Sequence, residues 1–166
     1  KLIQPATAAV EEPPPDRHRA LVVLLRDGAK FRRAAVADRL LQCTNCGGAF
    51  YGAGNAPANV RIERGILVVD QDHGSREVTR TLFRFRYEPA SMRFALIGFD
   101  VSSYDRAAGG SVSESTNLLT GLRVTTREKN GRERTSKSRA GRQTTYLDEI
   151  DAEAYEAAAI ERLGLG

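Results

Sequence analysis

Residues 79–87 alternate between two kinds of side chain, and this alternation constrains the fold more than any other feature of the chain. Apolar or β-branched residues occupy Thr79, Thr81, Phe83, Phe85 and Tyr87, and arginine occupies positions 80, 84 and 86. Because successive side chains of a β-strand point to opposite faces, the pattern predicts a strand with a core face and an arginine face. The chain therefore needs a β-sheet in which this strand can pair.

Neighbouring segments supply the other strands. Residues 60–63 alternate apolar and charged side chains, Arg64-Gly65 provides a turn, and residues 66–69 resume an apolar run, which together predict a hairpin. After a break at 88–91, residues 92–100 predict the strand that pairs with 79–87. Four strands with short links favour antiparallel pairing.

Other segments give weaker signals. The apolar run 20–25 suits a strand buried on both faces, and 31–42 fits either a strand or a short helix that leads into the cysteines. Residues 117–126 predict one more strand, followed by a hairpin-like turn at Asn130-Gly131. We interpret 70–75 as a polar turn and the Gly/Ser-rich 107–115 as a loop.

The clearest helix lies at the C-terminal end, from about 148 to 163, where Asp148 or Asp151 can cap it and Gly164 can end it. We expect a mainly β fold, an antiparallel sandwich or rolled sheet of six to eight strands with this C-terminal helix. The 166 residues are 41% hydrophobic and 28% charged, as in one ordinary globular domain. That domain should span 18–166, after a flexible lead-in at 1–17 that contains three consecutive prolines.

The two cysteines indicate a compartment. Cys43 and Cys46 leave no unpaired thiol, which agrees with an oxidising environment, and the chain begins at Lys1 rather than Met. We expect a periplasmic or secreted protein whose signal peptide has been removed, although a start chosen by design would look the same. No apolar run approaches the length of a membrane span.

The Cys43-x-x-Cys46 spacing allows three structures. A zinc site would need His18 and His73, which stand at none of the usual spacings, and a redox dithiol would need a helix that Gly47-Gly48 disfavours. A local disulfide is the simplest interpretation. We therefore expect neither a metal nor a cofactor.

An ordered set of short motifs resembles a group of exported bacterial β-rich proteins of unknown function. The motifs are the hairpin at 62–69, Gly74-Ser75, Phe83 to Tyr87, Leu96-Ile97-Gly98 and the Asn117 to Gly121 segment, and the match covers about 19–124. The resemblance implies an exported β-rich domain and carries no catalytic residues.

Charge is distributed unevenly along the chain. Residues 123–142 hold eight Lys or Arg and two Glu, so 8 − 2 gives +6, whereas 146–166 holds one Arg and six acids, so 1 − 6 gives −5. The basic stretch could bind phosphate or an acidic surface, or it could be a solvated face partly neutralised by the acidic helix.

We expect a non-enzymatic exported binding protein of the bacterial cell envelope. It would act through a protein interface, as an inhibitor or immunity protein does, with a toxin or hydrolase as partner. The candidate contact residues come from two segments, the loop 47–57, called the aromatic loop below, and the arginine face of the strand 79–87. They are Phe50, Tyr51, Asn55, Arg80, Arg84 and Arg86. The alternatives are a module that binds polyanions or nucleic acid through the arginine-rich strands, and an envelope hydrolase with His73 as base.

Overall fold

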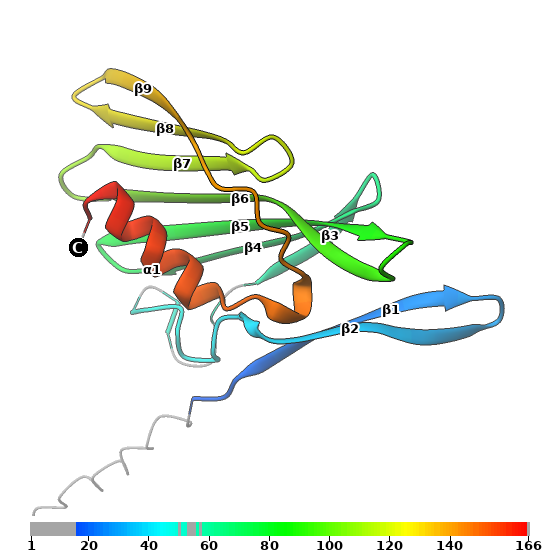
Figure 1. The fold of residues 1–166 in the computed structure, drawn as a ribbon. Helices are drawn as coiled ribbons and strands as arrows, with labels where there is room; N and C mark the ends of the chain where they lie inside the picture. The colour runs from blue at the N-terminus through cyan, green and yellow to red at the C-terminus, as the bar shows by residue number, and fades with distance from the viewer. Residues whose placement is uncertain (1–15, 50, 53–55, 57, 166) are drawn as a thin grey trace, which may run out of the picture.

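The computed structural model describes residues 16–49, 51–52, 56 and 58–165 (Figure 1). Most of the expected lead-in at 1–17 lies outside these residues. The elements follow one another as β1 (Arg19–Asp27), β2 (Lys30–Leu41), β3 (Asn59–Glu63), β4 (Ile66–Gly74), β5 (Glu77–Glu88), β6 (Arg93–Asp105), β7 (Ser111–Asn117), β8 (Leu122–Lys129), β9 (Arg132–Arg139), the 3-10 turn η1 (Leu147–Glu149) and α1 (Ala152–Leu163).

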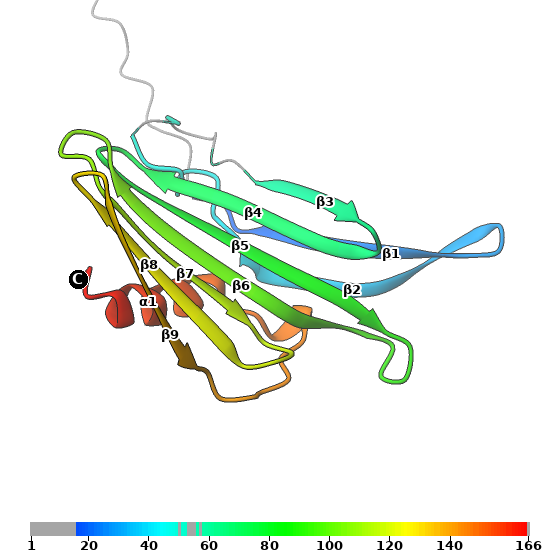
Figure 2. The same ribbon diagram turned by 90° about the horizontal axis from the view of Figure 1, so that it is seen from above.

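Two antiparallel sheets form the fold. Strands β3 to β9 pair in sequence order as a seven-stranded meander, and β1 pairs only with β2. Helix α1 lies across one face of the large sheet, and the β1–β2 hairpin lies beside the sheet near β4 and extends past its end (Figures 1 and 2). The expected mainly β fold with a C-terminal helix is confirmed.

The core lies between α1, the hairpin and one face of the large sheet. Phe83 and Phe85 are fully buried on that face, as the alternation predicted. The Tyr155 ring of α1 meets Phe83 and Phe99 edge-on, at centroid distances of 5.8 and 5.5 Å. These contacts fix the helix to β5 and β6.

The β1 strand corrects one expectation. Residues 20–25 were expected to be buried on both faces, but only Leu21, Val23 and Leu25 pack against the core. Val22 and Leu24 remain 49% and 56% exposed, because none of the described elements covers the other face of the hairpin. The segment for which the sequence allowed a strand or a short helix forms strand β2, from Lys30 to Leu41.

Two segments expected to be turns or loops are strands. Residues 70–74 continue β4, because each of them pairs with β5 in an unbroken register, and the turn lies at Ser75-Arg76. The serines 111, 113 and 115 belong to β7, which is held between β6 and β8 and buries Val112 and Thr116. Pairing on both sides overrides the turn preference of Gly and Ser.

Helix α1 starts later than expected. Asp151 is its N-cap and accepts a hydrogen bond from the Ala154 amide, while the residues just before it form η1. Gly164 ends the helix in the left-handed region, at φ 67°. Among the described residues, none of the helical segments is long and apolar enough to cross a bilayer.

Candidate functional site

The β8–β9 hairpin brings four cations to one face. Arg127 lies directly opposite Arg134, and Lys129 lies opposite Arg132. Arg127 also pairs with Val112, which is buried in the core, so the four side chains share the sheet face on which α1 lies. The Asn130-Gly131 turn predicted from the sequence sets this register.

These cations have few partners. Arg127 Nη2 donates a hydrogen bond of 2.6 Å to the Leu163 carbonyl at the end of α1. In the part of the chain that the structure describes, Lys129, Arg132 and Arg134 have no carboxylate within ion-pair distance. With Arg127 and Asn130 they line a depression of ≈ 560 Å³. Like charges directly opposite each other destabilise a hairpin, so an anion in this depression would be stabilising.

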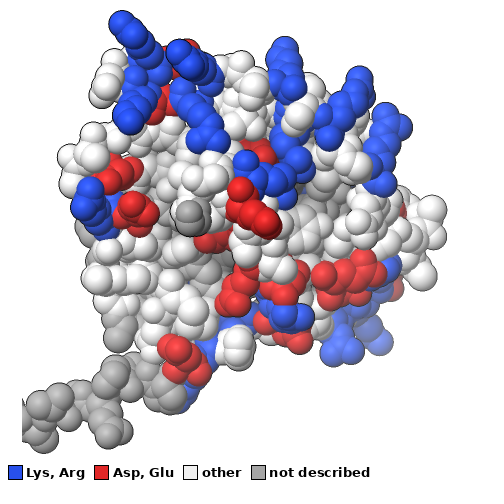
Figure 3. Space-filling model, turned by 60° about the vertical axis from the view of Figure 1, so that its left-hand side comes forward, with Lys and Arg blue, Asp and Glu red and all other residues white. Residues whose placement is uncertain are grey.

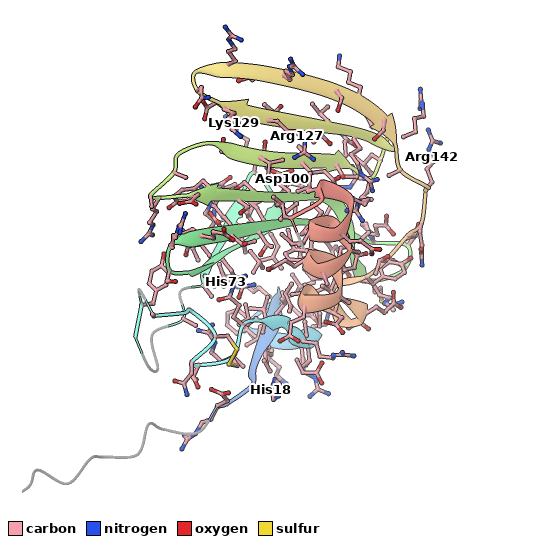
Figure 4. The ribbon with its side chains drawn as sticks, turned by 90° about the vertical axis from the view of Figure 1, so that its left-hand side faces the viewer. His18, His73, Asp100, Arg127, Lys129 and Arg142 are labelled. Atoms are coloured by element: carbon pink, nitrogen blue, oxygen red, sulfur yellow. A yellow bond between two sulfur atoms is a disulfide. The ribbon has the colours of Figure 1, made fainter. Side chains whose placement is uncertain are left out.

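The positive surface continues along β9 and beyond it. We define the basic edge as Arg127, Lys129, Arg132, Arg134, Lys137, Arg139 and Arg142. Every residue of β9 is exposed, and β9 is the last strand of the large sheet. Figure 3 shows Lys and Arg side chains along the top of the molecule, over β8 and β9, and Figure 4 shows Arg127, Lys129 and Arg142 in this region.

The acidic C-terminal segment does not neutralise the basic edge. Its carboxylates pair elsewhere: Asp148 and Glu149 with Arg93, Asp151 with Arg39, and Glu156 with His73. The segment contacts β2, β6 and β7, and at its C-terminal end the Leu163 carbonyl accepts the hydrogen bond from Arg127 on β8. Among the described residues, none of the ion pairs joins a carboxylate of this segment to the basic edge, so the expected partial neutralisation does not occur through direct ion pairs.

The arginines predicted on β5 lie on the opposite face of the sheet and are mostly paired. Arg80 donates to both oxygens of Asp70, at 2.7 and 2.5 Å, and this contact lowers the pKa of that carboxyl. Arg84 donates to Asp100 at 2.7 Å. Arg86 is exposed. A new partner would have to compete with the ion pairs that two of these three arginines already make.

The cysteine loop is held by a disulfide and by a close glycine contact. Cys43 and Cys46 are joined, which confirms the favoured interpretation and is compatible with an extracellular location. The Gly74 amide donates to the Gly47 carbonyl at 3.0 Å. A Cβ on Gly48 would lie 2.6 Å from the Gly74 carbonyl oxygen, so the loop sits directly on the end of β4.

The aromatic loop is described only in part. The Tyr51 hydroxyl donates to Asp72 at 2.6 Å, which raises the pKa of the tyrosine and ties the side chain to β4. Phe50 and Asn55 lie outside the described residues. The structure therefore places one of the three predicted loop contacts, and it places that one against the sheet.

A second concave site lies beside the disulfide. This cavity, of ≈ 490 Å³, is lined by both cysteines, His18, His73 and residues of α1. His73 Nε2 lies 2.8 Å from Glu156 Oε1, and the hydrogen bond to this carboxylate raises the pKa of the imidazole. Among the lining side chains only Thr81 carries a hydroxyl, and it is buried. The pair joins α1 to β4. Three other titratable residues, His18, Asp151 and Glu153, also line the cavity, and Asp151 pairs with Arg39.

Two buried polar residues were not found by sequence reasoning. The Gln71 side chain accepts a hydrogen bond from the Gln42 backbone N–H and donates one to the Leu40 carbonyl, so it ties β4 to β2. Glu114 is 2% exposed and pairs with Arg162 and Arg123. Nothing in the local sequence marks either residue, because both are paired with residues distant in the chain.

The comparisons with known proteins give no further guide. No family model, curated protein or solved structure matches the chain.

Proposed function

We propose that this chain is a non-enzymatic, exported binding protein of the bacterial cell envelope that engages an acidic protein partner through the basic edge. A toxin or hydrolase that the chain inhibits is the kind of partner envisaged. One observation carries the proposal: the β8–β9 register sets Arg127 opposite Arg134 and Lys129 opposite Arg132, and the described carboxylates leave three of these cations unpaired.

The geometry favours carboxylates as ligands. Arginine binds a carboxylate through two parallel hydrogen bonds, which gives both energy and orientation. Arg132 and Arg134 stand two residues apart and therefore share one face of β9. Side chains of an extended peptide beside β9 would share a face at the same two-residue spacing. A partner strand with acidic residues at alternate positions would pair its backbone with the free edge and its carboxylates with Arg132 and Arg134.

Nucleic acid is the weaker alternative for this surface. Proteins that bind single strands without sequence preference combine cations with aromatic side chains that stack on the bases. The face of β8 and β9 that carries the four cations has only Arg, Lys, Thr and Ser: Arg123, Thr125, Arg127, Lys129, Arg132, Arg134, Ser136 and Ser138. The aromatic residues of β5 lie in the core.

The hydrolase alternative has less support than the binding function. Its proposed base, His73, is engaged with Glu156, and the lining of the cavity offers one buried hydroxyl as nucleophile. This arrangement is typical of an ion pair that holds a helix to a sheet.

A comparative pull-down tests the proposal. The wild-type domain, the double variant Arg132→Glu/Arg134→Glu and a control would each be used to capture proteins from the envelope and culture fractions of the source. The control Arg17→Glu/Arg64→Glu makes the same change in net charge at exposed arginines away from the basic edge. Mass spectrometry identifies and quantifies the captured proteins.

We expect an acidic protein to be retained by the wild type and the control and lost by the β9 variant. Equal retention by all three would contradict the proposed interface. Capture of nucleic acid alone, released by salt, would replace the protein partner with a polyanion.

A further inference from the structure

The outer face of the β1–β2 hairpin is an apolar surface that the proposed function does not use. Val22 lies opposite Val36, Leu24 opposite Arg33, and Arg26 opposite Phe31. Because directly paired and alternate residues share a face, one side of the hairpin carries all six of these residues: Val22, Leu24, Arg26, Phe31, Arg33 and Val36. The other side, with Leu21, Val23 and Leu25, packs against the core.

The exposure of this face increases toward its tip. Val22 is 49% exposed, Leu24 56% and Phe31 68%. In both ribbon views the tip extends well past the ends of the other strands (Figures 1 and 2). A flat surface can therefore meet the tip without contact with the body of the domain, and a two-stranded hairpin cannot bury these side chains itself.

Cations surround the apolar tip. From 26 to 33 the chain carries four cations, Arg26, Lys30, Arg32 and Arg33, and one acid, Asp27, so 4 − 1 gives +3. Arg26 and Arg33 lie on the same face as Leu24 and Phe31. Long basic side chains can keep their charge at a polar boundary while their stems lie along apolar groups.

We propose that the tip of the β1–β2 hairpin inserts into the interface of an anionic lipid surface. Phe31 and Leu24 enter the boundary between headgroups and acyl chains, and Arg26, Arg33 and Lys30 contact the anionic headgroups. This site is separate from the basic edge, because β1 and β2 form their own two-stranded sheet whereas β8 and β9 belong to the large sheet, and the inference does not depend on the proposed function.

The charges favour lipid over a second copy of the chain. A two-fold contact through this face would enclose Arg26 and Arg33 of both copies in one interface, and like charges at an interface oppose association. An anionic bilayer offers both complementary charge and an apolar layer at the depth that Phe31 can reach.

Tryptophan fluorescence provides a direct test, because the chain contains no tryptophan. The variant Phe31→Trp places a single reporter at the tip. Leu119→Trp is the matched control, since Leu119 is also exposed, at 49%, but lies in the turn between β7 and β8. Both proteins would be titrated with vesicles of phosphatidylcholine alone and with vesicles that also contain phosphatidylglycerol.

We expect a blue shift of Phe31→Trp emission with the phosphatidylglycerol vesicles and no shift for Leu119→Trp. The affinity for these vesicles, measured by sedimentation, should be about tenfold lower for Phe31→Ser and for Leu24→Ser, because each variant loses much of the apolar transfer energy of its side chain. The β9 variant Arg132→Glu/Arg134→Glu should keep the Phe31→Trp shift, which separates this inference from the proposed function.

Three results would overturn the inference. The first is an unchanged Phe31→Trp spectrum with anionic vesicles, and the second is sedimentation that Phe31→Ser and Leu24→Ser leave intact. The third is a blue shift that appears without vesicles as protein concentration rises, which would assign the face to a second copy.

Discussion

Replacing Gln71 by methionine should destabilise the fold, because this side chain links β4 to the end of β2. Gln71 is 2% exposed. Its Oε1 accepts a hydrogen bond of 2.8 Å from the Gln42 backbone N–H, and its Nε2 donates one of 2.9 Å to the Leu40 carbonyl. Methionine has a similar length but makes neither bond, so two backbone groups lose their partner. A buried group left unpaired costs roughly 1–3 kcal/mol, and the Gln42 amide is only partly buried.

We therefore expect Gln71→Met to lower the free energy of unfolding by about 3 kcal/mol, which lowers Tm by roughly 6–12 °C for a domain of this size. Urea unfolding followed by circular dichroism measures the change, and the m-value should stay the same.

Gln42→Met is the matched control for this prediction. The Gln42 Oε1 atom is buried without a hydrogen-bond partner among the described residues, so its removal should cost less than about 0.5 kcal/mol or even stabilise the fold. If Gln71→Met were no more destabilising than Gln42→Met, the bridge between the sheets would have no energetic role and the reasoning would fail.

Two further predictions concern the cavity and the cysteine loop. The pKa of His73 is raised in the folded protein, so its ion pair with Glu156 contributes fully below the unfolded value of about 6.5 and is lost as pH rises through the folded pKa. The Tm deficit of Glu156→Gln should accordingly be larger near pH 6 than at alkaline pH, and a deficit independent of pH would contradict the pairing. Gly48→Ala places a Cβ 2.6 Å from the Gly74 carbonyl oxygen, whereas Gly52→Ala meets nothing within 4 Å, although both glycines have positive φ. In urea unfolding, Gly48→Ala should therefore lower the free energy of unfolding by at least about 1 kcal/mol more than Gly52→Ala does. Equal losses would show that the loop can move away from β4 without cost.

Local patterns predicted much of the fold. The alternation at 79–87 placed Phe83 and Phe85 in the core, and Arg64-Gly65 and Asn130-Gly131 located two hairpin turns. These features depend on residues close together in the chain. The end of α1 at Gly164 was predicted for the same reason.

Features that depend on distant residues were not predicted. The serines of β7 form a strand because β6 and β8 flank it, and β1 keeps one apolar face exposed because none of the described elements covers it. Gln71 and Glu114 are buried because partners from β2 and α1 reach them. Such pairings cannot be derived from a local pattern.

The candidate site was predicted only in outline. The excess charge of 123–142 was visible in the sequence, and the acidic helix was expected to neutralise part of it. In the structure, four carboxylates of the acidic segment pair instead with Arg93, Arg39 and His73. Two of the three arginines chosen on β5, Arg80 and Arg84, are paired with Asp70 and Asp100. The direction in which each charged side chain points depends on strand register and packing, and composition alone does not determine either.

A titration of the isotope-labelled protein with an extended peptide that carries glutamate at alternate positions tests the central claim most directly. If the basic edge binds acidic protein segments, the backbone amide resonances of β9 should shift most, and their hydrogen exchange should slow as the peptide pairs with the free edge. Arg132→Glu/Arg134→Glu should abolish both effects, while Arg17→Glu/Arg64→Glu should preserve them. Shifts concentrated elsewhere, or unchanged by the β9 variant, would contradict the account.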